Sequence, residues 1–210
     1  MSTVLVVLLV AMMPVFAVVA LWDRLRRGRG SDVDVASCLA NLDRLNAVTA
    51  SGLMDGPLRP DLDLLTLEAA TTLGAPMSVM SVMDDRRQFF ASQYGLDEDL
   101  AAARGTPASE SYCQYVVAFD KALRVDDARR HPLVNHHPAT LAGTRSYLGV
   151  PLRTEAGHTI GSFCVVATAA RHWTTEDRST LEGIAARAMT SVSDGSWQTV
   201  SLDRKSRNGQ

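Results

Sequence analysis

The sequence has almost no net charge and few cysteines. Its formal net charge is −2 and its pI about 6.2 over 210 residues, so no basic field is available to recruit nucleic acid. Three cysteines, an odd number, exclude a disulfide framework and are typical of a reducing compartment, where thiols stay free. The spacing of His131, His136 and His137 matches no common zinc pattern, and no internal repeat is present. We therefore expect one ordinary domain with accessory segments.

A long apolar run stands at the N-terminus. Residues 3–22 contain no charged residue, and roughly 20 apolar residues are needed to cross a bilayer as a helix. Arg24 and three further arginines up to Arg29 follow, and positive flanks stay on the cytoplasmic side. The run predicts a single-pass anchor in the cell membrane over residues 1–23 and a basic connector over 24–34, with the rest of the chain cytoplasmic. A cleaved signal peptide is the alternative, but its positive charge would precede the apolar run.

The segment after the connector has the spacing of a short helical seam. Val35, Cys38, Leu42 and Leu45 recur at alternating intervals of three and four residues, which is an a/d pattern. The pattern predicts a linker helix over residues 35–52. It is too short for a stable coiled coil by itself, so we expect it to assist a homodimer. A signal between membrane and domain would pass through it.

Apolar patterning in the rest of the chain predicts paired strands with helices at the ends. The expected elements are a helix over 62–73, a hairpin over 77–95, a loop over 95–108, a helix capped by Ser109, a short strand over 122–128, a hairpin over 147–168 and a helix opening at Trp173. This order is typical of the α+β class with an antiparallel sheet. One core should extend over about residues 40–193.

Seven short motifs occur in a fixed order along this pattern. They are SGLMDGP, APMSVMSVMDDRRQFF, SYCQYVV, LRVDDARRHPLV, YLGVPL, GHTIGSFCVV and RHWTTED. Together they resemble the GAF domain, in the bacterial form often found upstream of serine/threonine phosphatase or histidine kinase modules. The resemblance runs over about residues 44–190. It implies a six-stranded antiparallel sheet with helices packed on one face and a small-molecule pocket on the other, formed here by residues 53–193 ahead of a polar tail, 194–210.

The resemblance also shows departures from relatives whose ligands are known. Tyr115 stands where the family often has histidine, and Gln114 follows Cys113 where bilin-binding relatives place histidine. The pattern of cyclic-nucleotide-binding relatives is absent as well. The ligand and any cofactor therefore remain unknown. Since no output module follows the domain, we expect a partner signalling protein that acts in trans.

The candidate residues are those that the GAF resemblance places near its pocket. They are Phe90, Cys113, Gln114, Asp126, Tyr147 and Cys164. Phe90 or its neighbour Gln88 is expected to line the pocket, and Tyr147 can offer its hydroxyl to a ligand or to the core. Asp126 has a second interpretation, as a salt-bridged anchor of its loop. Cys113 and Cys164 are interpreted as small buried groups that line or back the pocket, because free cysteine is commonly buried.

Two functions remain open. The first is a membrane-anchored, non-catalytic GAF sensor or scaffold that binds a small molecule or a partner protein in signal transduction. The second is a redox sensor or reductase that uses Cys113, related to the GAF branch that reduces free methionine sulfoxide. The cysteine motifs of that branch do not match the positions found here. A GAF domain that binds nothing and serves only as a dimer module is a third hypothesis.

Overall fold

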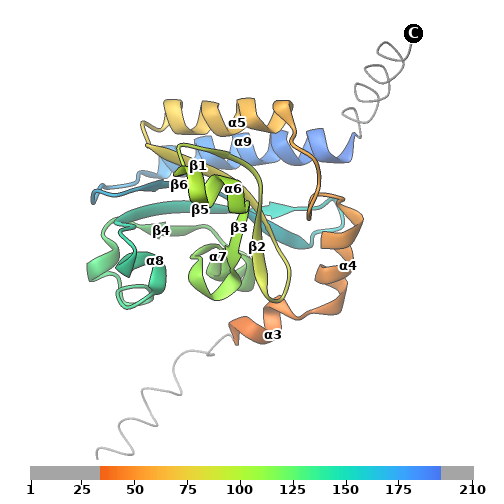
Figure 1. The fold of residues 1–210 in the computed structure, drawn as a ribbon, viewed down its shortest axis with the longest axis horizontal. Coiled ribbons are helices and arrows are strands. Elements are labelled where there is room, and N and C mark those ends of the chain that lie inside the picture. The colour runs from red at the N-terminus through yellow and green to blue at the C-terminus, as the bar shows by residue number, and fades with distance from the viewer. Residues whose placement is uncertain (1–33, 195–210) are drawn as a thin grey trace, which may run out of the picture. The chain divides into compact units, whose positions relative to one another are not determined.

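The computed structural model describes residues 34–194, which form a six-stranded sheet with helices on both faces (Figure 1). The strands are β1 Met77–Met83, β2 Arg87–Tyr94, β3 Gly105–Pro107, β4 Leu123–Val125, β5 Ser146–Arg153 and β6 Thr159–Ala167. The helices are α3 Val35–Leu39, α4 Leu42–Ala50, α5 Pro60–Thr72, α6 Glu98–Ala103, α7 Cys113–Phe119, α8 Pro138–Leu141 and α9 Thr175–Ser193, with 3₁₀ turns η1 Ala108–Glu110 and η2 Ala128–Arg130.

The sheet has the order β3-β2-β1-β6-β5-β4, and every neighbouring pair is antiparallel. The α+β class, the six-stranded antiparallel sheet and the two hairpins are confirmed. The helix predicted to open near Trp173 is confirmed as α9, because Thr174 and Asp177 form a capping box: the Asp177 N–H donates to Thr174 Oγ1 at 3.0 Å, and the Thr174 N–H donates to Asp177 Oδ2 at 2.8 Å.

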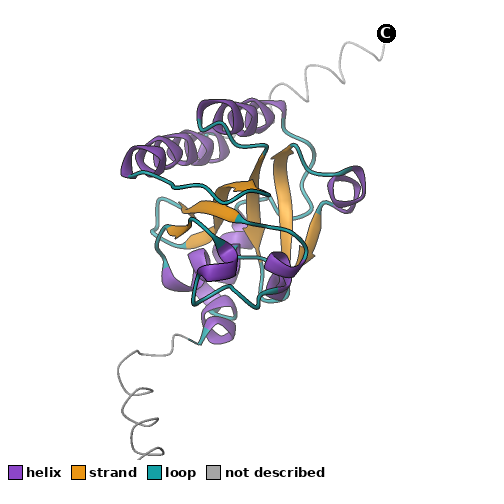
Figure 2. Cartoon of the chain, turned by 90° about the vertical axis from the view of Figure 1, so that its left-hand side faces the viewer, coloured by secondary structure: helices purple, strands orange, loops and turns teal. Residues whose placement is uncertain are grey.

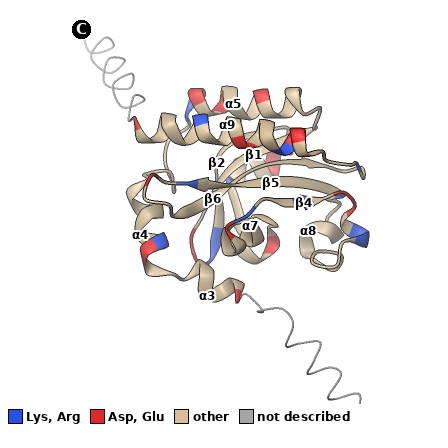
Figure 3. Ribbon diagram, turned by 180° about the vertical axis from the view of Figure 1, so that it is seen from behind, with Lys and Arg blue, Asp and Glu red and all other residues tan. Residues whose placement is uncertain are grey.

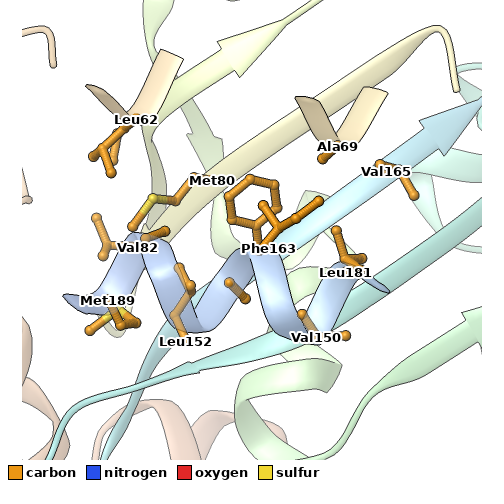
Figure 4. Packing of buried hydrophobic residues seen from close by; sticks show 14 of the residues in the cluster. Leu62, Ala69, Met80, Val82, Val150, Leu152, Phe163, Val165, Leu181 and Met189 are labelled. Carbon is orange, nitrogen blue, oxygen red and sulfur yellow. The ribbon is translucent and has the colours of Figure 1, made fainter. Parts of the chain in front are cut away.

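One face of the sheet packs against the two long helices, α5 and α9, which lie side by side (Figure 1). Alternate residues of the central strands point to this side and meet the apolar stripes of both helices (Figure 4). Phe163 of β6 lies at the centre of this layer, beside Met80 and Leu181, and none of the three is exposed. The layer is mainly apolar, and its buried Thr66 and Ser92 hydroxyls bond to each other at 2.9 Å, while Ser92 donates to Asp63 at 2.7 Å.

The second face is covered by shorter helices, which corrects the expectation of helices on one face only. Helix α7 contacts β5 and β6, and α3 contacts α7. Figure 2 shows helices on both sides of the sheet. Because both faces are covered, the strands β1 and β6 are buried along almost their whole length and contain no charged residue (Figure 3). Lys, Arg, Asp and Glu lie instead on other helices, in the loops and on the outer strands or strand ends, such as Arg87, Arg124 and Arg153. The second face contains cysteine, serine and tyrosine among its apolar residues.

The close pairing of β1 and β6 depends on Gly161. A Cβ at this position would lie 1.9 Å from the backbone carbonyl oxygen of Ser81. Ser78 and Ser81 of β1 can be buried because their hydroxyls donate to backbone carbonyls of β6, each at 3.2 Å. The serines of the motif MSVMSVM are therefore buried in the sheet with their hydroxyls paired.

The segment predicted as one linker helix is divided into α3 and α4. The chain breaks at Asn41, whose side chain accepts from the Arg44 N–H at 3.0 Å and so starts a new helix. Of the predicted seam, Leu42 is 74% exposed, whereas Val35, Cys38 and Leu45 are half-buried. The seam is thus not continuous, because part of it packs on the domain.

Arg44 attaches this segment to the sheet. Its guanidinium is 6% exposed and donates to the Met83 carbonyl at the end of β1, at 2.6 Å, and to the Leu39 carbonyl at the end of α3. A charged group is rarely buried without such partners. The contact fixes α3 and α4 on the domain, α3 beside α7 and α4 beside β6.

Three predictions fall outside this picture or are changed by it. The predicted anchor, connector and tail fall on residues that lie outside the described range, and no helix within 34–194 is long and apolar enough to span a membrane. The stretch 95–108, expected to be a loop, contains α6 and the edge strand β3. The helix expected to start at Ser109 begins at Cys113, since residues 108–110 form the turn η1.

Candidate functional site

A pocket of about 160 Å³ lies on the second face of the sheet, between β1, β2, β5 and β6 and the start of α7. We call it the α7 pocket. It is lined by Met77, Val79, Gln88, Phe90, Leu96, Leu100, Thr106, Glu110, Ser111, Tyr112, Cys113, Ala139, Thr144, Tyr147, Cys164 and Val166. Most of these side chains are apolar, with a few polar groups among them, which is the usual composition of a small-molecule site.

Two cysteines meet at the inner end of the pocket. Cys113 is the first residue of α7, where its backbone N–H donates to Ser111 Oγ at 3.1 Å. Cys164 comes from the middle of β6 and pairs with Val79 and Gly149. The two Sγ atoms are 4.0 Å apart, both residues are free thiols, and each is 2% exposed.

Polar groups surround the sulfur of Cys113. Gln88 Nε2 donates to it at 3.5 Å, and the Tyr147 hydroxyl lies 3.4 Å from it. The same hydroxyl is 3.3 Å from Ser162 Oγ. Tyr112, which precedes Cys113, packs edge-on against the Tyr147 ring with centroids 5.4 Å apart. The sulfur therefore occupies a buried, hydrogen-bonded position rather than a purely apolar one.

These contacts shift the pKa values of the two thiols in opposite directions. Hydrogen bonding from Cys164, opposed by burial and supported by Ser111 and Tyr147, lowers the pKa of Cys113 to about 6. The hydrogen bond to Cys113 and burial raise the pKa of Cys164 well above its ordinary value. Two adjacent negative charges in a buried site repel each other. The pair therefore releases one proton readily and holds the second.

The position of Tyr147 depends on a glycine two residues further along β5. A Cβ at Gly149 would lie 2.1 Å from the Tyr147 hydroxyl, because residues i and i+2 of a strand share a face. Burial, followed by the charge of Cys113, raises the pKa of Tyr147, so its hydroxyl stays protonated and can donate. Gly149 thus allows the phenol to lie flat along the strand and reach the sulfur.

The comparison with known families agrees with this architecture. The model of the GAF domain matches residues 61–192, which is more than half of the chain. The chain belongs to the GAF domain family. A cyclic di-GMP phosphodiesterase of Pseudomonas aeruginosa is 34% identical over 103 residues, which are 48% of this chain and 17% of that protein. The chain thus spans about a sixth of that relative's length.

Solved structures of GAF domains show the same fold. The GAF domain of an Acinetobacter phosphoenolpyruvate-protein phosphotransferase superimposes with a TM-score of 0.55 at 16% identity, covering 75% of this chain and 96% of that one. A type II free methionine-R-sulfoxide reductase from Thermoplasma acidophilum gives a TM-score of 0.54 at 17% identity, covering 65% and 92%. At these identities the likeness concerns the fold.

The structure brings four of the six candidate residues together. Phe90, Cys113, Tyr147 and Cys164 line the pocket of this GAF domain, as does Gln88. Gln114 does not line it, although it follows Cys113 directly. Its amide donates to the Ser111 carbonyl at 3.0 Å and lies 3.0 Å from His137 Nε2. A helix turns about 100° per residue, so neighbours on α7 point to different sides.

Asp126 also lies away from the pocket, and its position fits the interpretation as a loop anchor. One carboxylate oxygen accepts from the Trp173 N–H at 3.1 Å, and the other lies 2.8 Å from His172 Nδ1. Partial burial by itself raises the pKa of Asp126, but the Trp173 N–H, His172 and Arg124 outweigh it and lower the pKa below its ordinary value. Asp126 holds the chain that enters α9, so its role is structural.

Several lining residues were missed because they come from segments without a regular pattern. Thr106 lies in the short edge strand β3, and Leu96 and Leu100 lie in or beside α6, all within the stretch expected to be a loop. Thr106 Oγ1 is buried and has no hydrogen-bond partner among the described residues. Such an atom carries a desolvation cost of about 1–3 kcal/mol, which a ligand could remove by accepting from it. Sequence alone gives no signal for this.

The contact between Gly149 and Tyr147 can be tested by a double-mutant cycle. Gly149→Ala is expected to lower the free energy of unfolding by about 1–3 kcal/mol, because the new methyl group overpacks against the phenol. In a Tyr147→Val background the same change should cost much less, since the clash is removed. Urea denaturation of the four proteins measures the coupling.

Gly183→Ala in α9 is the matched control, because a Cβ there meets nothing within 4 Å. It should be neutral or stabilising, since alanine favours a helix over glycine by roughly 1 kcal/mol. If Gly149→Ala lowers the free energy of unfolding equally in the unmodified and the Tyr147→Val proteins, the proposed contact between residue 149 and the phenol is wrong.

Proposed function

We propose that this GAF domain is a non-catalytic sensor that binds one small, mostly apolar molecule in the α7 pocket. The observation that carries the proposal is the lining itself. Apolar side chains form most of the wall, while Thr106 Oγ1 is a buried hydroxyl with no partner within residues 34–194. A ligand that fills the apolar volume and accepts a hydrogen bond from Thr106 would satisfy both features.

The size and polarity of the pocket limit the class of ligand. Its volume of about 160 Å³ is close to that of a cavity that holds a benzene-sized molecule, roughly 150 Å³. The lining includes no lysine or arginine, and its charged member, Glu110, is exposed. A phosphate or carboxylate group would find no cation within the lining, so the ligand is expected to be neutral or to place a positive group beside Glu110.

The packing of α7 offers a route by which occupancy could be transmitted. The core of the second face joins Tyr112, Cys113 and Val116 to Leu39 of α3. Arg44 links the end of α3 to the end of β1. A ligand that shifts the start of α7 would therefore displace α3, which leads to the N-terminal part of the chain. We propose that this part anchors the domain at the cytoplasmic side of a membrane and that a partner protein in trans provides the output.

Filling the pocket with protein atoms tests the ligand directly. Ala139 is half-buried and lines the α7 pocket from α8, so Ala139→Phe should occupy the ligand volume. Native mass spectrometry of the full chain, purified from the cells that make it, is expected to show a retained small molecule on the unmodified protein. The Ala139→Phe variant should lose most of that signal, because the new ring occupies the volume that the ligand would fill.

Ala142→Phe, at an exposed position just after the same helix, is the matched control and should retain the molecule. Circular dichroism and thermal unfolding establish that both variants are folded. The proposal fails if the unmodified protein carries no molecule, or if a folded Ala139→Phe variant carries it equally well.

A homodimer is a separate proposal, supported by the apolar surface of α4. Leu42 is 74% exposed, whereas Leu45 is half-buried, so Leu42 can be changed without disturbing the core. Leu42→Asp should weaken self-association about tenfold or more, because it places a charge in an apolar contact. Analytical ultracentrifugation of the full chain measures this effect.

Leu58→Asp serves as the control, since Leu58 is 71% exposed but lies in the loop before α5. It should leave the sedimentation behaviour unchanged. An unmodified chain that sediments as a monomer, or a Leu42→Asp variant that associates normally, would rule out the dimer through α4.

A further inference from the structure

We propose that Cys113 and Cys164 form a reversible dithiol–disulfide pair that a peroxide oxidises inside the α7 pocket. The two cysteines line the α7 pocket, but the argument for their oxidation does not require a bound ligand. It rests on the meeting of two cysteines from distant parts of the chain at one point, 4.0 Å apart between their sulfurs. Both line the pocket, so an oxidant small enough to enter it reaches both sulfurs without unfolding of the domain.

The geometry is close to that of a disulfide but does not form one without movement. A disulfide bond is about 2.05 Å long, so the sulfurs must approach each other by about 2 Å. Cys164 is held in the central strand β6, whereas Cys113 is the first residue of a short helix. We therefore expect Cys113 to make most of this movement, through rotation of its side chain and a small shift of the start of α7.

The surroundings of Cys113 favour the form that attacks a peroxide. The thiolate is the reactive species, and donors from Gln88 and Tyr147 are within reach of this sulfur. The hydrogen bond from Cys164 lowers the pKa of Cys113, which favours the thiolate of this residue over that of its neighbour. The raised pKa of Cys164 keeps this residue as a thiol, which is the form expected of the cysteine that reacts second.

The reaction balances with one peroxide molecule. The Cys113 thiolate attacks one peroxide oxygen, the O–O bond breaks and a sulfenic acid forms. The hydroxide that leaves takes up the proton released by Cys113 and becomes water. Cys164 then attacks the Cys113 sulfur, the S–S bond forms, the S–O bond breaks, and the second hydroxide leaves as water with the Cys164 proton. Two thiols lose two electrons and two protons in total, and the peroxide is reduced to two waters.

The disulfide would change both the pocket and the helix that covers it. It would link the start of α7 covalently to β6 and replace the Cys113 thiolate, which Gln88 and Tyr147 contact, with a neutral disulfide sulfur. Because α7 packs on α3, the same movement that we propose for ligand binding would follow from oxidation. Oxidation and ligand binding would then act on one element.

The test uses the full chain, hydrogen peroxide and its own third cysteine as an internal reference. Cys38 is half-buried in α3 and lies outside the pocket lining. After mild peroxide treatment, two of the three thiols should be lost, and the intact mass should fall by two hydrogen atoms. A tryptic digest without reductant should contain residues 105–121 joined to residues 154–171. Dithiothreitol should restore both thiols.

Two variants complete the design. Cys38→Ser should behave as the unmodified protein does. Cys164→Ser should stop at the sulfenic acid of Cys113, detected as one added oxygen and trapped by dimedone. The proposal is overturned if Cys113 and Cys164 stay reduced while Cys38 reacts, or if the recovered disulfide joins Cys38 to another chain. Because the readout is thiol chemistry without a pocket ligand, it stands or falls separately from the mass-spectrometric ligand test.

Discussion

The side chain of Tyr147, lying along β5 over Gly149, is the contact on which the second face of this GAF domain depends. Its hydroxyl reaches Cys113 from one side and Ser162 from the other, while its ring meets Tyr112. Through these contacts one residue connects the sheet to the start of α7. A larger residue at position 149 would push the phenol away, and the start of α7 would lose its support.

The two faces of the sheet have different roles because different helices and side chains cover them. Towards α5 and α9 the strands present mainly apolar side chains that interlock with two long helices, and the buried Ser92 hydroxyl is bonded to Thr66 and Asp63 of α5. Towards α7 the cover consists of short helices and turns, and polar side chains share the layer with apolar ones. Short elements leave space between them. A pocket with hydrogen-bonding groups, and two cysteines in contact, therefore arises on this face.

Much of the fold could be predicted because it follows regular patterns. Alternating residues marked the two hairpins, and the acidic first turn marked α9. The candidate site was only partly predictable. Cys113, Tyr147 and Cys164 lie on regular elements and line the α7 pocket, but Thr106 lies on a three-residue edge strand with no periodicity. Asp126 meets Trp173, 47 residues away, and the break at Asn41 is set by one side chain within an otherwise helical pattern. Contacts of these kinds are decided by tertiary packing rather than by local sequence.

The central claim is that the space between α7 and the sheet is a binding site. A crystal structure of the full chain, purified from the cells that make it, tests this most directly. The account predicts electron density for a non-protein molecule in the α7 pocket, with an acceptor atom within hydrogen-bonding distance of Thr106 Oγ1. A pocket filled by its own side chains or by water alone, or a molecule bound on the α5 and α9 face instead, would contradict it.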